Sequence, residues 1–317
     1  MVINIGFLIL GLVLLIKGAD WLVGGASAIA KKKNVSDLAI GLTIVAFGTS
    51  APELVVNVVA SVKDHQDIVF GNVIGSNNFN LLMILGIAGL ITPLVVQRST
   101  VYKEIPISLL AAILLFVLAN SFFTDQQILS RIDGIVLLIF FCLFLFYVYK
   151  QLKREPDKTE ATEIQTSQGK NWILLTIGLA YLVVGGRLVV TAAVDVATEM
   201  GVSEKLIGLT IVAAGTSLPE LATTVVAAVK RNCDIAVGNI IGSNIFNVFF
   251  ILGVSSVVRP IEFDEVFNID LYLLFGGTIF LFIVMFTSGK KILDLWEAAI
   301  LLFAYIAYTT WLITKEL

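Results

Sequence analysis

Residues 41–54 read GLTIVAFGTSAPEL, and residues 208–221 read GLTIVAAGTSLPEL. Twelve of these fourteen positions are identical, at a constant offset of 167 residues. At the same offset, GNVIGSNNFNLLMILG (71–86) matches GNIIGSNIFNVFFILG (238–253) at eleven of sixteen positions. The chain therefore contains an internal duplication, and each copy of the first phrase places one glutamate in otherwise apolar text.

The composition is that of a membrane protein. Of the 317 residues, 58% are hydrophobic and 14% are charged, whereas soluble domains have about 25% charged residues. Apolar runs reach the roughly 20 residues that a helix needs to cross a bilayer, without the alternation of a transmembrane β-barrel. We therefore predict an all-α membrane protein. The run starting at Ile3 has no basic region before it, so we expect a first transmembrane helix, not a cleaved signal peptide.

Ten transmembrane helices are predicted. They cover residues 3–27, 37–62, 67–92, 104–123, 131–150, 171–197, 205–229, 235–257, 268–287 and 291–314. One long polar stretch has the composition of a solvated linker and divides the spans five and five. The predicted parts are a first repeat (1–150, with its motif at 41–86), the linker (151–170) and a second repeat (171–317, with its motif at 208–253).

The odd number of spans in each half determines the topology. The second half must cross the membrane in the opposite sense to the first, which is the inverted repeat of many secondary transporters. With the N-terminus outside, fourteen Lys and Arg residues fall in cytoplasmic segments and five in external ones, as the positive-inside rule requires. We expect a multi-pass protein of the plasma (cell inner) membrane, with both termini outside and the linker in the cytoplasm.

Glu53 and Glu220 lie near the middle of the second and seventh predicted spans. A charged side chain at the bilayer centre costs about 2.5–3.5 kcal/mol on insertion scales, so two at symmetric positions indicate function. The alternative is a pair of protonated glutamates bonded within a packed bundle. Pro52 and Pro219 precede them and cannot donate to the carbonyl four residues back. Unwound backbone at membrane depth is tolerated where it lines a buried site.

Oxygen-bearing side chains accompany each glutamate at helical spacing. Four stripes fall at i, i+4 and i+8: Thr49, Glu53 and Asn57; Thr216, Glu220 and Thr224; Asn72, Ser76 and Asn80; and Asn239, Ser243 and Asn247. Ser50 and Ser217 join from three residues before the glutamates. We favour a lining role for Asn80 and Asn247. For Asn77 and Asn244, off the stripes, lining and simple interhelical hydrogen bonding both stay open.

These groups suit a hard cation. Ca²⁺ takes six to eight oxygen ligands, and Na⁺ is also oxygen-loving. No cysteine or histidine lies near the glutamates in sequence, which disfavours Zn²⁺ and Cu⁺; Mn²⁺ and Mg²⁺ are excluded less firmly. Two ionised glutamates hold a charge that one Ca²⁺, or two or more Na⁺, would neutralise. A carrier that moves only when loaded with one ion or the other is an antiporter.

At these residues the sequence resembles the calcium/cation antiporter superfamily, in particular prokaryotic-type sodium/calcium exchangers. The paired GTSxPE and GNxxGSNxxN phrases are similar to the two α-repeats of that family. The resemblance implies that Na⁺ entering down its gradient drives Ca²⁺ out by alternating access, with the first and sixth spans sliding past the others. It also implies ligands: Glu53 and Glu220 for both ions, the backbone carbonyls of Thr49 and Thr216 for Ca²⁺, and Ala46, Ala213, Ser50, Ser217, Ser76, Ser243 and Asn80 for Na⁺.

One position departs from part of the family. Some branches, including potassium-dependent exchangers, carry Asp where this chain has Asn247. We count Asn247 among the site residues, and its amide leans against potassium dependence. A proton-coupled antiporter of Ca²⁺ or another divalent cation such as Mn²⁺ stays as the alternative, and a cation channel is less favoured.

An enzyme is not expected. An intramembrane hydrolase would need an HExxH motif or an aspartate pair, but His65 is the one histidine of the chain and no Asp stands at the motif centres. We predict no cofactor, Ca²⁺ and Na⁺ as substrates, membrane lipid as the surroundings, no nucleic acid and no obligate protein partner. Within the first span, Lys17 and Asp20 could pair on one helix face, and Arg187 is the counterpart of Asp20 in the second half.

Overall fold

The computed structural model describes residues 2–33, 35–120, 127–152, 168–199, 213–287 and 291–316. In the first half the helical elements are α1 (Val2–Lys33), α2 (Asp37–Ile40), η1 (Gly41–Val45), α3 (Ala46–Thr49), α4 (Ala51–Val62), α5 (Gln66–Asn78), η2 (Phe79–Ile84), α6 (Leu85–Ile91), η3 (Thr100–Glu104), α7 (Ile105–Ala119) and α8 (Arg131–Leu152). In the second half they are α9 (Gln168–Glu199), α11 (Ala213–Gly215), α12 (Leu218–Val229), α13 (Cys233–Phe246), η5 (Asn247–Leu252), α14 (Gly253–Val258), η6 (Glu265–Phe267), α15 (Asn268–Val284) and α16 (Leu295–Glu316).

The prediction of a helical membrane protein is confirmed. Eight helices of the described residues are long and apolar enough to cross a membrane, and the bent pair Asp37–Thr49 and Ala51–Val62 makes a ninth candidate. The seventh predicted span begins outside the described residues. Within it the structure shows α12, a shorter apolar helix.

Several predicted boundaries are wrong by a few residues. α1 continues to Lys33 instead of ending at residue 27, and α7 ends at Ala119 instead of residue 123. α8 extends to Leu152 and α9 begins at Gln168, so these helices overlap both ends of the predicted linker, 151–170; the residues between the two helices lie outside the described part. The last helix begins at Leu295, four residues later than predicted, because a short strand precedes it.

Four two-residue strands were not predicted. β1 (Leu94–Val95) pairs antiparallel with β4 (Ile292–Leu293), and β2 (Ile128–Leu129) pairs antiparallel with β3 (Ile261–Glu262). Each pair joins a segment of the first half to one of the second. A strand of two residues shows no hydropathy alternation, so no sequence pattern announces it.

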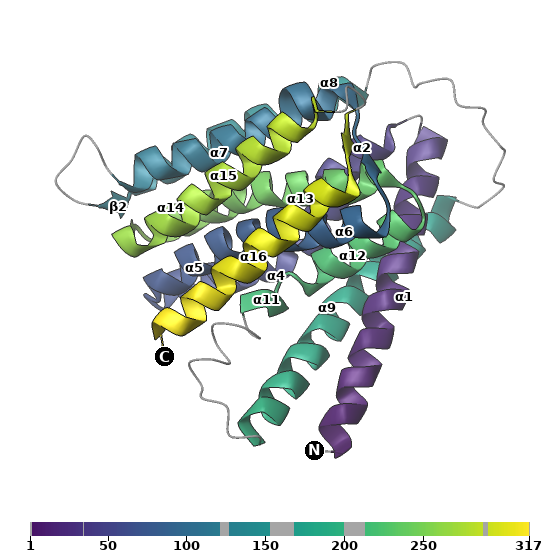
Figure 1. Cartoon of the computed structure of the whole chain (residues 1–317), viewed down its shortest axis with the longest axis horizontal. Coiled ribbons are helices and arrows are strands. Elements are labelled where there is room, and N and C mark those ends of the chain that lie inside the picture. Colours follow the sequence, from purple (N-terminus) through teal and green to yellow (C-terminus); the bar gives the residue numbers. More distant parts are fainter. Residues whose placement is uncertain are drawn as a thin grey trace.

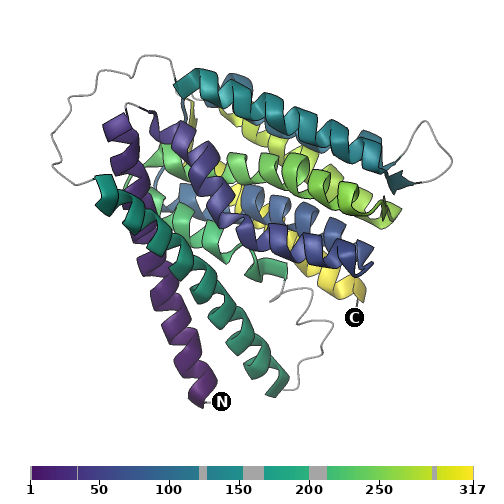
Figure 2. The ribbon, with the colours of Figure 1, turned by 180° about the vertical axis from the view of Figure 1, so that it is seen from behind.

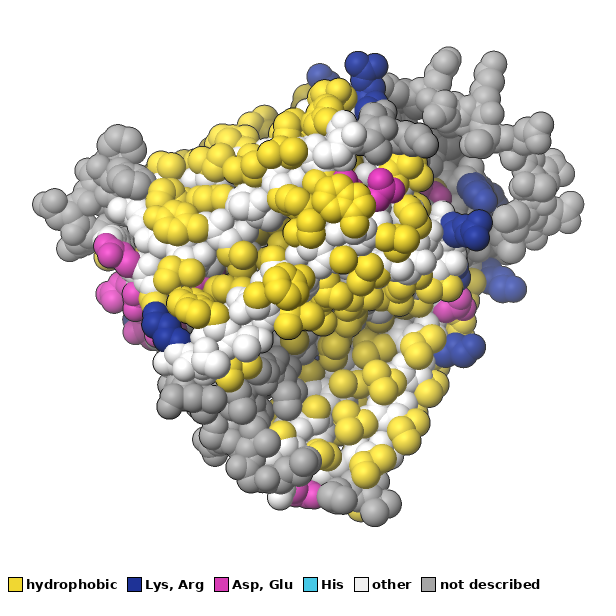
Figure 3. Space-filling view, viewed as in Figure 1, with side chains coloured by type: hydrophobic (Ala, Val, Ile, Leu, Met, Phe, Trp, Pro, Cys, Tyr) yellow, Lys and Arg dark blue, Asp and Glu magenta, His cyan; other side chains and the backbone are white. Residues whose placement is uncertain are grey.

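The helices form a bundle with two central members. In the most apolar 18 residues of each span, 94% of the residues are buried for Cys233–Val258 and 72% for Gln66–Ile91, while the remaining long spans have 39% or less. Figure 3 shows hydrophobic side chains over the flanks of the helices, with most visible Lys and Arg gathered toward one end of the molecule and Asp and Glu scattered more widely. The central helices therefore carry the site, and the outer ones separate it from the surroundings.

α1 and α9 lie side by side, and the N-terminal part of α1 and the C-terminal part of α9 lean away from the other helices (Figures 1 and 2). They run antiparallel and touch through glycines: a Cβ added to Gly18 would lie 2.8 Å from the Gly178 carbonyl oxygen, and one added to Gly11 would lie 2.9 Å from that of Gly185. Small residues at a helix interface let two backbones approach this closely. In the sequence these glycines recur seven residues apart, at Gly11 and Gly18 and at Gly178 and Gly185. The sequence analysis did not recognise this spacing as a helix interface.

Candidate ion-binding site

Two helix breaks create the site. α3 and α4 meet at Ser50 with a bend of 47°, and Ser50 has φ −82° and ψ 5°. In the second half Ser217 precedes α12 with φ −89° and ψ 8°. Pro52 and Pro219 follow in the first turns of α4 and α12, where proline fits because the first N–H groups of a helix have no intrahelical acceptor. The breaks expected from the two prolines are present.

Glu53 and Glu220 lie in the first turns of these two helices and are 1% and 0% exposed. The partial positive charge of a helix N-terminus favours a carboxylate at this position. Among the described residues the other buried charged side chains are Glu104 and Glu297, so all four are acidic and no buried Lys, Arg or His compensates them. A buried carboxylate without a partner of opposite charge needs a proton or a bound cation.

Each glutamate is held by a serine from the other half. Ser50 Oγ donates to Glu220 Oε1 at 2.9 Å, and Ser217 Oγ donates to Glu53 Oε1 at 3.1 Å. The two contacts interchange when both residues are replaced by their counterparts 167 positions away. The breaks therefore place each serine against the carboxylate of the opposite copy of the motif.

The serines of the next helices complete this layer. Ser50 Oγ lies 3.0 Å from Ser243 Oγ in α13, and Ser217 Oγ lies 3.1 Å from Ser76 Oγ in α5. All four hydroxyls are buried. The structure thus brings each glutamate together with two of the four predicted serines, in two groups that are related by the repeat.

Four buried oxygens of the site have no hydrogen-bond partner among the described residues. They are Glu53 Oε2, Glu220 Oε2, Asn80 Oδ1 and Asn247 Oδ1. The two asparagines lie one helical turn after the serines of α5 and α13. Buried polar groups in folded proteins are normally satisfied, and these four acceptors in symmetric positions are suited to bind a cation.

Thr49 and Thr216 directly precede the two serines and contact asparagines of the other half. Thr49 Oγ1 lies 3.1 Å from Asn239 Oδ1, and Thr216 Oγ1 lies 3.2 Å from Asn72 Oδ1. Thr49 is buried and Thr216 half-buried. Asn72 and Asn239, the first residues of two predicted stripes, therefore each contact the threonine of the opposite half. These contacts lie directly beside the two helix breaks.

The two alanines are less informative. Ala46 is fully buried, and its carbonyl oxygen accepts from Ser50 N at 3.0 Å. Ala213 is the first residue of α11, and its side chain lies outside the described part. Asn57 Nδ2 donates to the Glu53 carbonyl oxygen at 2.7 Å, so this amide nitrogen is engaged in a hydrogen bond within its own helix.

The donor set is oxygen-rich. No cluster of three or more His, Cys, Asp or Glu side chains that could hold a metal occurs in the described ranges. Any ion between Glu53 and Glu220 would therefore take its further ligands from hydroxyl, amide and carbonyl oxygens. Such ligands suit Ca²⁺ and other hard cations, not the softer metals that prefer thiolate or imidazole.

Several known proteins are similar to this chain in sequence and in fold. The sequence matches the sodium/calcium exchanger protein family over residues 3–150 and 170–314. The chain belongs to that family. It is 41% identical to the putative antiporter CaxA of Alkalimonas amylolytica over 95% of this chain and 96% of that protein. It is 39% identical to the inner membrane protein YrbG of Escherichia coli over 83% and 82% of the two chains.

A solved exchanger has the same fold. The sodium-calcium exchanger NCX_Mj, in crystals soaked with zero Na⁺ and Ca²⁺, superposes with a TM-score of 0.83 at 35% identity, over 98% of this chain and 100% of that one. The family consists of multi-pass membrane transporters with Na⁺ and Ca²⁺ as substrates, so this exchanger-family chain is an antiporter and not an enzyme.

For two pairs of residues in this exchanger-family protein, the sequence did not identify the correct role or partner. Asn77 and Asn244 bond to one another across the bundle and to the site asparagines. Asp20 pairs with Lys230 at 2.7 Å and not with Lys17, because the close packing of α1 on α12 brings Lys230 to it. Helical spacing shows which side chains share a face but not which partner a neighbouring helix offers.

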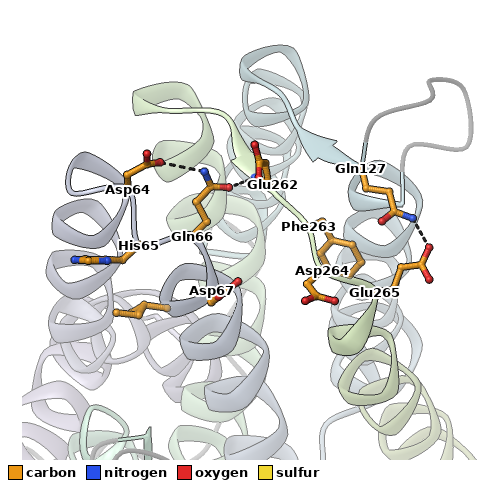
Figure 4. Close-up of a pocket in the computed structure, with 10 residues that line it drawn as sticks. Asp64, His65, Gln66, Asp67, Gln127, Glu262, Phe263, Asp264 and Glu265 are labelled. Carbon is orange, nitrogen blue, oxygen red and sulfur yellow. Dashed lines mark hydrogen bonds between the residues drawn. The ribbon is translucent and has the colours of Figure 1, made fainter.

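A second polar feature lies apart from the glutamates. Figure 4 shows a surface pocket of about 770 Å³ between the α4–α5 turn and the segment around β3, lined by acidic side chains that include Asp64, Glu262 and Glu265. Asp64 already pairs with Arg259 at 2.6 Å, and Gln127 donates to Glu265 at 2.5 Å. Its groups are open to solvent, unlike the buried oxygens of the site.

Proposed function

We propose that this protein exchanges Na⁺ for Ca²⁺, with the ions bound at the midplane between Glu53 and Glu220. One observation carries the proposal: each buried carboxylate accepts a hydrogen bond at one oxygen from a serine of the other half, and its second oxygen has no partner among the residues that the structure describes. One Ca²⁺, or two or more Na⁺, would neutralise the pair. The empty, charged site would be costly to carry through the barrier, which couples movement to ion binding.

The proposed ligands are those that the resemblance to the exchanger family implies. Glu53 and Glu220 serve both ions, and the backbone carbonyls of Thr49 and Thr216 serve Ca²⁺. For Na⁺ we propose as further ligands Ser50, Ser217, Ser76, Ser243, Ala46, Ala213 and Asn80. Asn247 is included among the site residues without being assigned to one ion. The unpartnered amide oxygens of Asn80 and Asn247 support their inclusion.

The proposed architecture is ten spans in two inverted repeats, 1–150 and 171–317, joined by the linker. Two observations support it. Contacts of the site recur with both partners exchanged at an offset of 167 residues. The glycine contacts between the antiparallel helices α1 and α9 do the same, since Gly11 meets Gly185 and Gly18 meets Gly178.

Access to the site would alternate by sliding of α1 and α9 over the other helices. In this conformation α1 packs along α12, and α9 has no comparable packing along α4. Val55 and Val59 of α4 are accordingly 54% and 45% exposed. The end of the bundle where Lys230 pairs with Asp20 is thus the closed one in this conformation.

The proposed location is the plasma (inner) membrane, with both termini outside and the linker in the cytoplasm. The gathering of Lys and Arg toward one end of the molecule (Figure 3) supports this orientation, because cytoplasmic segments are rich in these residues. The closed end is then the cytoplasmic one.

The test is ion flux in reconstituted liposomes. Liposomes loaded with Na⁺ are diluted into K⁺ or choline, and ⁴⁵Ca²⁺ uptake is measured for the wild type, Glu53→Gln, Glu220→Gln and the surface control Glu262→Gln. We expect uptake that needs the outward Na⁺ gradient, persists in Glu262→Gln and is lost in the two site variants. Equal uptake driven by a pH gradient without Na⁺ would mean that protons and not Na⁺ are the coupling ion. Uptake of Mn²⁺ but not Ca²⁺ would mean that the divalent substrate is Mn²⁺.

A further inference from the structure

Four buried asparagines form a closed cluster where α5 and η2 meet α13 and η5. Asn77, Asn80, Asn244 and Asn247 are each 1% exposed. Asn77 Nδ2 donates to the Asn244 carbonyl oxygen at 3.2 Å, and Asn244 Nδ2 donates to the Asn77 carbonyl oxygen at 3.3 Å. Asn80 Nδ2 donates to Asn244 Oδ1 at 3.1 Å, and Asn247 Nδ2 donates to Asn77 Oδ1 at 2.9 Å.

The backbone determines the orientation of all four amides. A main-chain carbonyl oxygen can only accept a hydrogen bond. Asn77 and Asn244 must therefore turn their NH₂ groups toward the carbonyls, and each is left with its Oδ1 facing the other asparagine pair. Asn80 and Asn247 must then offer their NH₂ groups to those oxygens. No amide in the cluster can flip without setting an acceptor against an acceptor.

The result is a fixed direction for the two site oxygens. With their NH₂ groups engaged, Asn80 and Asn247 point Oδ1 away from the cluster, and both oxygens are buried and unpartnered among the described residues. They lie one turn beyond Ser76 and Ser243, which contact the glutamate–serine layer. An amide turned the other way would present two hydrogens to a cation and repel it.

We propose that Asn77 and Asn244 are positioning residues for ion binding: Asn77 orients the Asn247 amide and Asn244 orients the Asn80 amide. The inference rests on the proposed function, because an oriented oxygen matters only if an ion uses it. Each positioning residue acts on the ligand of the opposite repeat. The cluster also explains why an amide suits position 247, since an aspartate there would place an acceptor against Asn77 Oδ1.

The crossed pattern gives a sharp test by double-mutant cycles. Ca²⁺ affinity is measured by calorimetry on the purified full chain, and Na⁺ affinity by competition with Ca²⁺. Losing one hydrogen bond changes affinity roughly two- to twelvefold. We expect Asn77→Ala to weaken by that factor the ion that Asn247→Ala weakens. In an Asn247→Ala background Asn77→Ala should have no further effect, and in an Asn80→Ala background it should keep its full effect.

Asn78→Ala is the matched control. Asn78 is a buried neighbour in the same helix, and its Nδ2 donates at 2.9 Å to the Asp270 carbonyl oxygen, away from the cluster. It should lower thermal stability without changing ion affinity. If Asn77→Ala does not fold, Asn77→Ser replaces it, because its hydroxyl keeps a polar group in the cluster but ends one bond short of the contact with Asn247.

The outcomes separate this inference from the proposed function. Ion binding by the wild type with an additive Asn77–Asn247 cycle, or with equal coupling of Asn77 to Asn80 and Asn247, would overturn the positioning role alone. A wild-type chain that binds neither Na⁺ nor Ca²⁺ would overturn the proposed function and the positioning role with it.

Discussion

At the scale of single residues, the site depends on how each carboxylate divides its two oxygens. Glu53 Oε1 and Glu220 Oε1 each accept a hydrogen bond from a serine of the other half, and each Oε2 has no partner in the described part of the chain. The serine donors stabilise the ionised carboxylates, and the second oxygens stay available to a cation.

Removing one serine donor should therefore weaken ion binding. A hydrogen bond to a charged group contributes about 1.5–3 kcal/mol, so we expect Ser217→Ala to lower the affinity for the transported ions at least about tenfold. Ser50→Ala should act similarly through Glu220. Calorimetric titration with Ca²⁺ in the presence and absence of Na⁺ measures the effect.

The control for this prediction is Ser61→Ala. Ser61 is also buried in α4, but its hydroxyl donates to the Asn57 carbonyl oxygen at 2.9 Å within the helix. Ion affinity in Ser61→Ala should stay at the wild-type level. Equal losses of ion affinity in Ser61→Ala and Ser217→Ala would contradict this prediction, because they would show that loss of any buried hydroxyl in these helices weakens ion binding.

At the scale of helices, two devices arrange the site. The breaks before α4 and α12 put a helix N-terminus beside each glutamate, and the glycine contacts bring α1 and α9 into backbone contact. This close contact holds α1 and α9 together as a pair, as the proposed sliding of both helices over the remaining bundle requires.

The glycine interface makes a prediction about single methyl groups. A Cβ at Gly18 would lie 2.8 Å from the Gly178 carbonyl oxygen, whereas a Cβ at Gly6 in the same helix meets nothing within 4 Å. Overpacking typically costs about 1–3 kcal/mol. We expect Gly18→Ala to lower the thermal denaturation temperature in detergent and to slow exchange, while Gly6→Ala changes neither. Identical melting curves for the two variants would contradict the tight interface.

Sequence predicted much of this and left specific gaps. The duplication, the breaks at Pro52 and Pro219 and the oxygen stripes all follow from residue types and spacing. The crossed contact of Ser50 with Glu220 does not, because spacing defines a helix face and not the face that meets it. The cluster around Asn77 is hidden for the same reason, and the β-strands are too short to leave a pattern.

At the scale of the whole molecule, the two halves differ in charge where they are alike in shape. Asp20 of α1 pairs with Lys230 after α12, and Asn232 bridges Ser27 and Asp37 at the same end, at 2.8 Å to each. The counterparts of Asp20 and Lys230 are Arg187 and Lys63, two like charges. In the opposite conformation, with α9 packed on α4 as α1 packs on α12 here, Arg187 would lie near Lys63. The attraction between Asp20 and Lys230 would then be replaced by a repulsion between two positive charges.

This charge difference should bias the resting conformation. An exposed ion pair contributes about 0.2–1 kcal/mol, so Asp20→Asn should shift the balance up to roughly fivefold toward the state with α1 away from α12. Arg187→Asp, which gives Lys63 a partner, should shift it the same way. Distances between spin labels at positions 17 and 229, in a chain with Cys142 and Cys233 replaced by serine, report the populations. Unchanged distance distributions in both variants would remove the bias.

The central claim is that Glu53 and Glu220 together form one site that Ca²⁺ and Na⁺ share. Calorimetric titration of the purified protein with Ca²⁺ at increasing Na⁺, with choline holding ionic strength constant, tests it most directly. We predict one Ca²⁺ per chain, an apparent affinity that falls as Na⁺ rises, and loss of binding in both Glu53→Gln and Glu220→Gln. Ca²⁺ binding that is indifferent to Na⁺, or that survives in either variant, would contradict the shared site.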